Sequence, residues 1–159
     1  MLERLLLLLK EIGDDVAIIR TDADTPHFTF LRRKGVKVGD EIMSPEYTSD
    51  VGVFDVRRGT LTDVGHYVKH TGLGRKGNSG SPIYDKNGYM LAIHHSGGYD
   101  GATPYSRNVN MGTHIYIVSE FLQANNIKYY IEPVDSRSIV DSENFKKSFA
   151  VGIMCGKKI

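Results

Sequence analysis

Short runs of β-branched and aromatic residues follow one another along most of the chain, and turn-forming residues separate them. This rhythm is typical of an all-β protein, and several short strands at close spacing predict a β-barrel or a β-sandwich. The most specific local signal is Asn87-Gly88, which joins two apolar runs and predicts a hairpin with strands at 82–84 and 89–94. The predicted strands lie within residues 16–20, 27–33, 51–64, 81–85, 89–95 and 113–118.

One stretch near the C-terminal side has a helical pattern. In "VSEFLQANN", Ser119 is a plausible N-cap, Phe121 and Leu122 would face inward, and the asparagines would end the helix. We therefore predict a short C-terminal helix over residues 119–126. Beyond it the pattern loosens, so residues 128–159 are predicted to form a loosely structured tail.

Composition limits the function classes. The 159 residues are 40% hydrophobic and 25% charged, which is typical of an ordinary soluble globular protein of about one domain. The formal net charge of +1 gives no reason to expect a nucleic acid or a membrane as the main partner. Cys155 is the single cysteine, so it can form no internal disulfide and shares no metal site with a second cysteine. We expect neither a metal nor a cofactor.

The N-terminal segment is apolar but short. Its uninterrupted run, Leu5 to Leu9, is shorter than the apolar region of a secretory signal and far too short to span a bilayer. The sequence therefore predicts a packed structural element here and no signal peptide.

The stretch "KGNSGSPIYD", residues 76–85, holds Ser79 between Gly77 and Gly80. A serine hydroxyl is a poor nucleophile unless it is exposed on a tight turn, activated by a base and placed beside N–H groups that stabilise an oxyanion. Glycines permit such a backbone, but the same residues also form ordinary turns between strands. The motif alone leaves both interpretations open.

Several segments in order resemble the chymotrypsin-like serine proteases. "GNSGSPIYDKNGYMLAIHHSGG" is similar to the family's nucleophile turn, following hairpin and substrate-binding strand, and "DDVAIIR" is similar to the strand that follows the triad aspartate. "NMGTHIYIVSEFLQAN" resembles the last barrel strand running into the C-terminal helix. The resemblance covers roughly residues 13–127, and its disulfide-free character is closest to glutamyl endopeptidases and to astrovirus-like proteases of positive-strand RNA viruses.

The resemblance implies an all-β fold with a chymotrypsin-like six-stranded β-barrel and a short C-terminal helix. The second barrel would be complete within residues 38–127, and residues 1–37 would be a partial first barrel that carries the triad aspartate. Ser79 aligns with the nucleophile, and the N–H groups of Gly77 and Ser79 align with the oxyanion hole. Asp15 aligns with the aspartate that orients the catalytic histidine. Because strand side chains alternate, Asp14 should point to the other face.

The resemblance also implies a substrate-binding strand at residues 94–98. Relatives that cut after Glu or Gln carry a histidine in this strand, and His94 occupies that register, with Ser96 and Gly97 following it. A histidine there can donate a hydrogen bond to a carboxylate or amide of the P1 residue, the residue before the cleaved bond. His95 should face the opposite way. Leu73 stands where trypsin-type enzymes place an acidic residue, which argues against an Arg or Lys preference.

The chain departs from the family at the general base. In the family the histidine precedes the aspartate, whereas all six histidines of this sequence follow Asp15. We therefore expect this chain alone to have little peptidase activity. Three explanations stay open: a mis-started or truncated reading frame, a fragment whose partner supplies the first strands, or a degenerate pseudoprotease. An upstream segment that supplies the catalytic histidine is a possible partner.

Two functions from different classes follow from these observations. The first is a serine endopeptidase that cleaves peptides or a polyprotein after Glu or Gln, in viral polyprotein processing or as a bacterial glutamyl endopeptidase. The second is a non-catalytic protease-fold module that binds a peptide as an added strand at residues 94–98. The compartment is undetermined by the sequence, and a viral protease would work in the host cytoplasm.

Overall fold

The computed structural model describes residues 7–12, 16–20, 29–48, 53–72, 78–98 and 109–131. Several residues singled out from the sequence lie outside the described residues, namely Asp14, Asp15, Leu73, Gly77 and Cys155, as does almost all of the predicted tail. The description below concerns the remainder of the chain.

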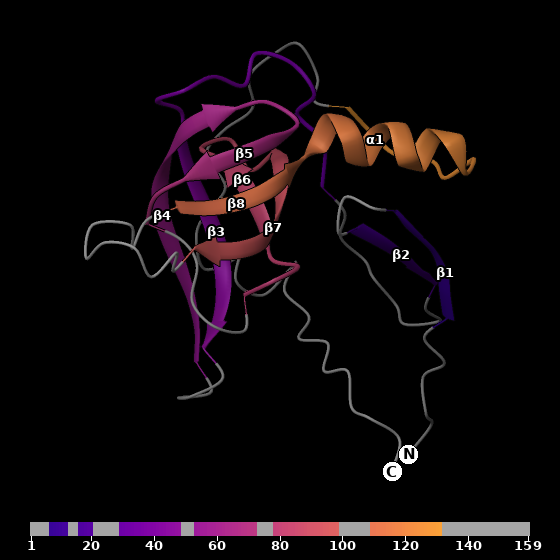
Figure 1. Ribbon diagram of the computed structural model, residues 1–159, viewed down its shortest axis with the longest axis horizontal. Coiled ribbons are helices and arrows are strands. Elements are labelled where there is room, and N and C mark those ends of the chain that lie inside the picture. Colours follow the sequence, from indigo (N-terminus) through magenta and orange to yellow (C-terminus); the bar gives the residue numbers. More distant parts are fainter. Residues whose placement is uncertain are drawn as a thin grey trace.

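Six antiparallel strands form a closed barrel, with the spatial order β3-β4-β5-β8-β7-β6 (Figure 1). A separate two-stranded sheet pairs β1 with β2, and a single helix follows β8. The prediction of a chymotrypsin-like six-stranded barrel with a short C-terminal helix is confirmed. No helix in the described part is both long and apolar enough to cross a membrane. The elements are β1 (Leu7–Ile12), β2 (Val16–Arg20), β3 (Glu41–Thr48), β4 (Val53–Val64), β5 (Tyr67–His70), β6 (Pro82–Asp85), β7 (Met90–Gly98), β8 (Val109–His114) and α1 (Ile115–Ala124).

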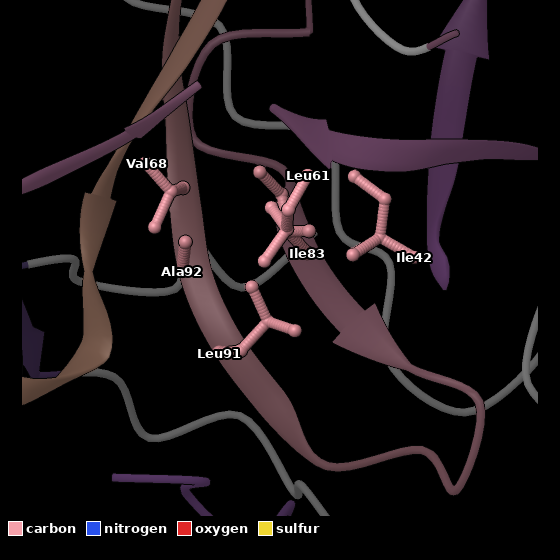
Figure 2. Packing of buried hydrophobic residues seen from close by; sticks show 6 residues of the cluster. All are labelled: Ile42, Leu61, Val68, Ile83, Leu91 and Ala92. Atoms are coloured by element: carbon pink, nitrogen blue, oxygen red, sulfur yellow. The ribbon is translucent and has the colours of Figure 1, made fainter. Parts of the chain in front are cut away.

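Aliphatic side chains from five strands fill the interior of the barrel, and Figure 2 shows them pointing toward one another. Each of these side chains is at most 2% exposed. Burial of each valine, leucine or isoleucine stabilises the fold by about 1.5 to 3 kcal/mol. Strand alternation accounts for most of this set. The two consecutive members on β7 both reach the interior because the β6–β7 register shifts at this point. The cluster consists of Ile42, Leu61, Val68, Ile83, Leu91 and Ala92.

A second apolar cluster joins the β1–β2 sheet to the helix. Val16 of β2 packs with Ile115, Val118 and Phe121 of α1, and Leu31 completes the group. In Figure 1 the two-stranded sheet accordingly lies beside α1, outside the barrel. The helix therefore contacts both the β7–β8 side of the barrel and the smaller sheet.

The helix begins earlier than predicted. The sequence indicated Ser119 as the N-cap and a strand over residues 113–118, but α1 starts at Ile115 with His114 at the N-cap, so both expectations are wrong. Ser119 lies buried inside the helix, where its Oγ donates a hydrogen bond to the carbonyl of Tyr116 at 2.7 Å. Burial of the face formed by Ile115, Val118 and Phe121 outweighs the strand preference of its β-branched and aromatic residues.

The predicted hairpin at Asn87-Gly88 is present and is braced by a buried carboxylate. The Oδ1 atom of Asp85 accepts hydrogen bonds from the backbone N–H groups of Asn87 at 2.8 Å and Tyr89 at 3.0 Å. Its Oδ2 atom accepts from Arg32 at 3.1 Å, and the Asp85 side chain is only 2% exposed. The carboxylate thus fixes the turn between β6 and β7, the two strands that flank the candidate site.

Replacing Asp85 with alanine is expected to lower the free energy of unfolding by about 3 kcal/mol, because one buried and one partly buried N–H group lose their acceptor and Arg32 loses a buried partner. Arg32 keeps its other ion pair, with Asp40 at 3.1 Å, so the loss comes mainly from the turn. Urea unfolding at pH 7 measures the change. Asp63→Ala is the matched control, because the Asp63–Lys69 ion pair is about half exposed on both sides and should contribute less than about 1 kcal/mol. Equal losses in the two variants would contradict this account.

Candidate functional site

Ser79 lies on a sharp turn that leads into β6. Asn78, before it, is 1% exposed, whereas Ser79 itself is exposed. Gly80, after it, has φ of 87°, a backbone conformation that glycine adopts without strain. This combination presents the Ser79 hydroxyl at the surface on an anchored backbone.

Backbone hydrogen bonds attach this turn to β7. The N–H of Gly80 donates to the carbonyl of His94 at 2.7 Å, and the N–H of His94 donates to the carbonyl of Ser81 at 2.9 Å. The Oγ of Ser79 donates to the carbonyl of His95 at 3.1 Å. The structure therefore brings Ser79 and the His94 region together, as the resemblance implied, although these residues are separated by a complete hairpin in the sequence.

The remaining predicted site residues divide into two groups. Ser96 and Gly97 lie on β7 just after His94, where the register with β8 shifts between His94 and Ser96. The Ser96 hydroxyl is buried and has no hydrogen-bond partner among the described residues. Asp15 and Gly77 lie outside the described residues, so their predicted roles stay predictions.

The two neighbouring histidines of β7 have different surroundings. His94 is 4% exposed, and its Nδ1 lies 3.1 Å from Nε2 of His70, a fully buried residue of β5. The two rings meet edge to face, with centroids 5.2 Å apart and planes at 60°. The His95 ring instead packs against the ring of Tyr67 at 5.2 Å.

Strand register explains how side chains from β5 and β7 meet although β8 separates these strands. Gly112 of β8 pairs with Val68 on one side and with His94 on the other. A Cβ at position 112 would lie 2.7 Å from the carbonyl oxygen of Ile93 and 3.2 Å from Cδ1 of Ile83. A larger residue at position 112 would therefore collide with the backbone of Ile93, so glycine allows β8 to lie close to β7 beside His94.

Burial keeps both imidazoles neutral near pH 7. Desolvation, with a smaller contribution from the neighbouring His94, lowers the pKa of His70 from 6.5 to about 4, and the Thr71 backbone partly opposes the shift. Desolvation likewise lowers the pKa of His94 to about 4, with a smaller effect from His95. A neutral imidazole has one N–H donor and one acceptor nitrogen, so the pair has a defined donor and acceptor.

These shifts predict that the fold loses stability in mild acid. Below pH 6.5 the unfolded chain binds protons at both histidines before the folded chain does, so stability falls from about pH 6.5 toward pH 4 and levels off below. A pKa shift of this size on one histidine corresponds to a loss of about 3 kcal/mol in the free energy of unfolding. Denaturant unfolding at pH 7, 5.5 and 4 measures the loss.

The comparison variants for this acid effect are His94→Gln and His66→Gln. His94→Gln removes a buried imidazole and should reduce the loss between pH 7 and 4, whereas His66→Gln removes an exposed one and should leave it unchanged. An acid loss that is the same in His94→Gln as in the original chain would contradict the assignment.

His70 and Asn110 belong to the site region but were not singled out from the sequence. Asn110 is 6% exposed and pairs in register with His70 on β5 and with Gly97 on β7. One signal was available for His70, because "YVKH" places it on the same strand face as Val68, where a histidine in an apolar row is unusual. No comparable signal marks Asn110. Among the described residues, no group of three or more His, Cys, Asp or Glu side chains could hold a metal ion.

Comparison with known proteins identifies the fold. No protein-family model matches this chain, and no curated protein sequence matches it. Solved structures do match. The HtrA-type protease AlgW with a decapeptide is 19% identical, with a TM-score of 0.64 over 76% of this chain and 40% of that chain. The active form of the Rv3671c protease from M. tuberculosis is 13% identical, with a TM-score of 0.66 over 80% of this chain and 61% of that chain.

A third similar structure is the MamO protease domain from Magnetospirillum magneticum in its apo form. It is 18% identical to this chain, with a TM-score of 0.56 over 74% of this chain and 67% of that domain. At these identities the likeness defines the fold class, which is that of the chymotrypsin-like serine proteases. This chain spans less than two thirds of the length of the AlgW and Rv3671c chains.

Proposed function

We propose that this chain provides the nucleophile-bearing part of a serine endopeptidase, with Ser79 as the nucleophile. The observation that carries the proposal is the Ser79 turn, which exposes one hydroxyl on a backbone attached to β7 by the Gly80–His94 hydrogen bond. No hydrogen bond between described residues uses the N–H of Ser79. That N–H would form the oxyanion hole together with the N–H of Gly77, and Asp15 would orient the general base.

The proposed substrate is a peptide or polyprotein cleaved after Glu or Gln. His94 lies on the strand next to Ser79, is almost fully buried and is neutral at pH 7. A neutral imidazole that donates one N–H can bind either a carboxylate or an amide oxygen of a P1 side chain. Processing of a polyprotein of a positive-strand RNA virus is the biological role that the sequence resemblance supports.

A second candidate is a protease-fold module that binds a peptide without cleaving it. The observation in its favour is that the Ser79 hydroxyl donates to the His95 carbonyl, while no histidine side chain in the described part hydrogen-bonds to it. Such a module would hold the peptide as an added strand beside residues 94–98.

Peptide cleavage by the complete gene product that contains this chain separates the two candidates. The assay uses peptides that differ only at P1, with Glu, Gln, Ala or Lys, followed by mass spectrometry of the products. A protease should cut after Glu or Gln and lose this activity in Ser79→Ala. Binding without cleavage, unchanged in Ser79→Ala, would support the non-catalytic module, and cleavage after Lys alone would contradict the proposed specificity.

A further inference from the structure

The chain turns back sharply after α1. The helix ends at Ala124, and Asn126 has φ of 56°, the left-handed conformation in which many helices end. The N–H of Ile127 donates to the carbonyl of Leu122 at 2.9 Å, which is the characteristic bond of a Schellman motif. This turn sets the direction of residues 127–131.

Residues 127–131 lie against the linker that joins β2 to β3. The N–H of Leu31 in this linker donates to the carbonyl of Tyr130 at 2.8 Å, and Leu31 forms a parallel bridge with Ile131. On its other side Leu31 forms a parallel bridge with Met90, the first residue of β7. The linker is therefore held between the barrel and the chain that follows α1.

Side chains add to this attachment. Tyr129 is partly buried and packs on the apolar cluster that contains Val16 of β2 and Leu31 of the linker. The Tyr129 hydroxyl lies 3.5 Å from a guanidinium nitrogen of Arg33, and Arg33 forms an ion pair with Glu120 of α1 at 2.7 Å. One group of contacts thus joins β2, the linker, α1 and the segment after it.

The attachment is shallow on its outer side. Tyr130 is 41% exposed and Ile131 is 49% exposed. Within the described part of the chain, a single backbone hydrogen bond joins residues 127–131 to the linker. Segments with few buried contacts and few hydrogen bonds open at a lower free-energy cost than a barrel core. Residues 127–131 can therefore detach while the barrel stays folded.

We propose that residues 127–131 form a clasp, which holds the β1–β2 sheet against the barrel and releases it when the clasp opens. The clasp binds the linker that connects this sheet to β3, and its Tyr129 ring shares an apolar cluster with Val16. The chain after α1 therefore controls how firmly the N-terminal sheet is docked. Because Val16 directly follows Asp15, opening would also move the residue proposed to orient the general base, and this consequence alone rests on the proposed function.

Hydrogen exchange measured by NMR on the 159-residue chain tests the clasp without any substrate. Tyr129→Ala should speed exchange of the Leu31 N–H about 10- to 100-fold, because a partly buried ring no longer holds the segment. Nuclear Overhauser contacts between Val16 and the α1 members of its cluster should weaken in the same variant. The N–H of Thr71, which donates to the carbonyl of Thr60 in the barrel, should exchange as in the original chain.

Lys128→Ala is the matched control for Tyr129→Ala. The Lys128 ammonium lies over the exposed Tyr130 ring, outside the apolar cluster, so its removal should leave exchange of the Leu31 N–H unchanged. Unchanged Leu31 exchange in Tyr129→Ala would overturn the inference. Equal acceleration at Leu31 and Thr71 would also overturn it, because it would assign Tyr129 to the general stability of the fold. Faster Leu31 exchange with undiminished Val16 contacts would show that the clasp does not hold the sheet.

A second pair of variants changes the turn and leaves Tyr129 in place. Valine is strained at φ of 56°, whereas glycine adopts this conformation readily. Asn126→Val should therefore speed Leu31 exchange as Tyr129→Ala does, and Asn126→Gly should not. The same exchange rate in the valine and glycine variants would contradict a clasp that depends on this turn.

Peptide cleavage by the complete gene product separates failure of the clasp from failure of the proposed function. Ser79 and β7 stay in the barrel when the clasp opens, so Tyr129→Ala should lower kcat about 10-fold and leave KM unchanged. If the original protein cleaves no peptide, the proposed function is wrong, and hydrogen exchange still decides whether the clasp exists. A change in KM with kcat unaltered would overturn the link between the clasp and Asp15.

Discussion

Replacing Ser79 with alanine is expected to lower kcat/KM for peptide cleavage by the complete gene product by about 10⁴- to 10⁶-fold. The exposed hydroxyl is the only group that this change removes, and the turn itself is held by backbone hydrogen bonds of Gly80 and Ser81 that alanine leaves intact. Peptide binding should therefore persist while turnover is lost. Steady-state kinetics and calorimetric titration with the same peptide measure the two effects separately.

The control for Ser79 is Thr62→Ala, which removes an exposed hydroxyl from β4 and should leave turnover unchanged. A Ser79→Ala protein that still cleaves within about 10-fold of the original rate would assign the nucleophile to another residue. The non-catalytic module would show a third pattern, because neither the original protein nor the variant would turn over the peptide.

Replacing His94 with alanine is expected to lower kcat/KM for substrates with Glu or Gln at P1 by about 10² to 10⁴-fold, or about 3 to 5 kcal/mol of transition-state binding. A polar P1 group buried without its partner loses a hydrogen bond and keeps its desolvation penalty. Substrates with a small apolar P1 residue never use that partner and should lose much less. A P1 series measured with one enzyme preparation gives the comparison.

His95→Ala is the neighbouring control for this prediction. The His95 ring packs on Tyr67 rather than on His70, so its removal should affect polar and apolar P1 substrates to the same extent. Its carbonyl, which accepts from Ser79, is part of the backbone and is retained. A larger or more P1-selective effect from His95 than from His94 would show that the wrong histidine has been assigned to the pocket.

The sequence predicted the β6–β7 hairpin, β2 and β4, because each of these elements has its own local pattern of residues. The number and spacing of such strands predicted a barrel fold. The sequence missed β1, β3 and β5 as strands, and the strand predicted within residues 27–33 is present among the described residues only as isolated bridges. Pro45 lies within β3, and proline normally argues against a strand. The structure accommodates it opposite Val56, beyond Ile42 and Met43, the residues of β3 that pair with β6. β5 has only four residues, of which one is aliphatic, so its strand signal in the sequence is weak although burial alternates along it in the structure.

Only the part of the candidate site that lies within local sequence motifs could be predicted from the sequence. Ser79 and His94 carry motif information, whereas the His70–His94 contact depends on the registers of β5, β8 and β7. Those registers arise from packing between segments that are far apart in the chain. No local pattern of polar and apolar residues encodes them.

Covalent labelling tests the central proposal, that Ser79 is an activated nucleophile, most directly. The complete gene product is incubated with a fluorophosphonate, and the modified residue is located by peptide mass spectrometry. The account predicts one adduct, on the Ser79 hydroxyl, which is absent from Ser79→Ala and is slowed by a peptide with Glu or Gln at P1. A protein that cleaves such a peptide but carries its adduct elsewhere, or that never labels at Ser79, would contradict it.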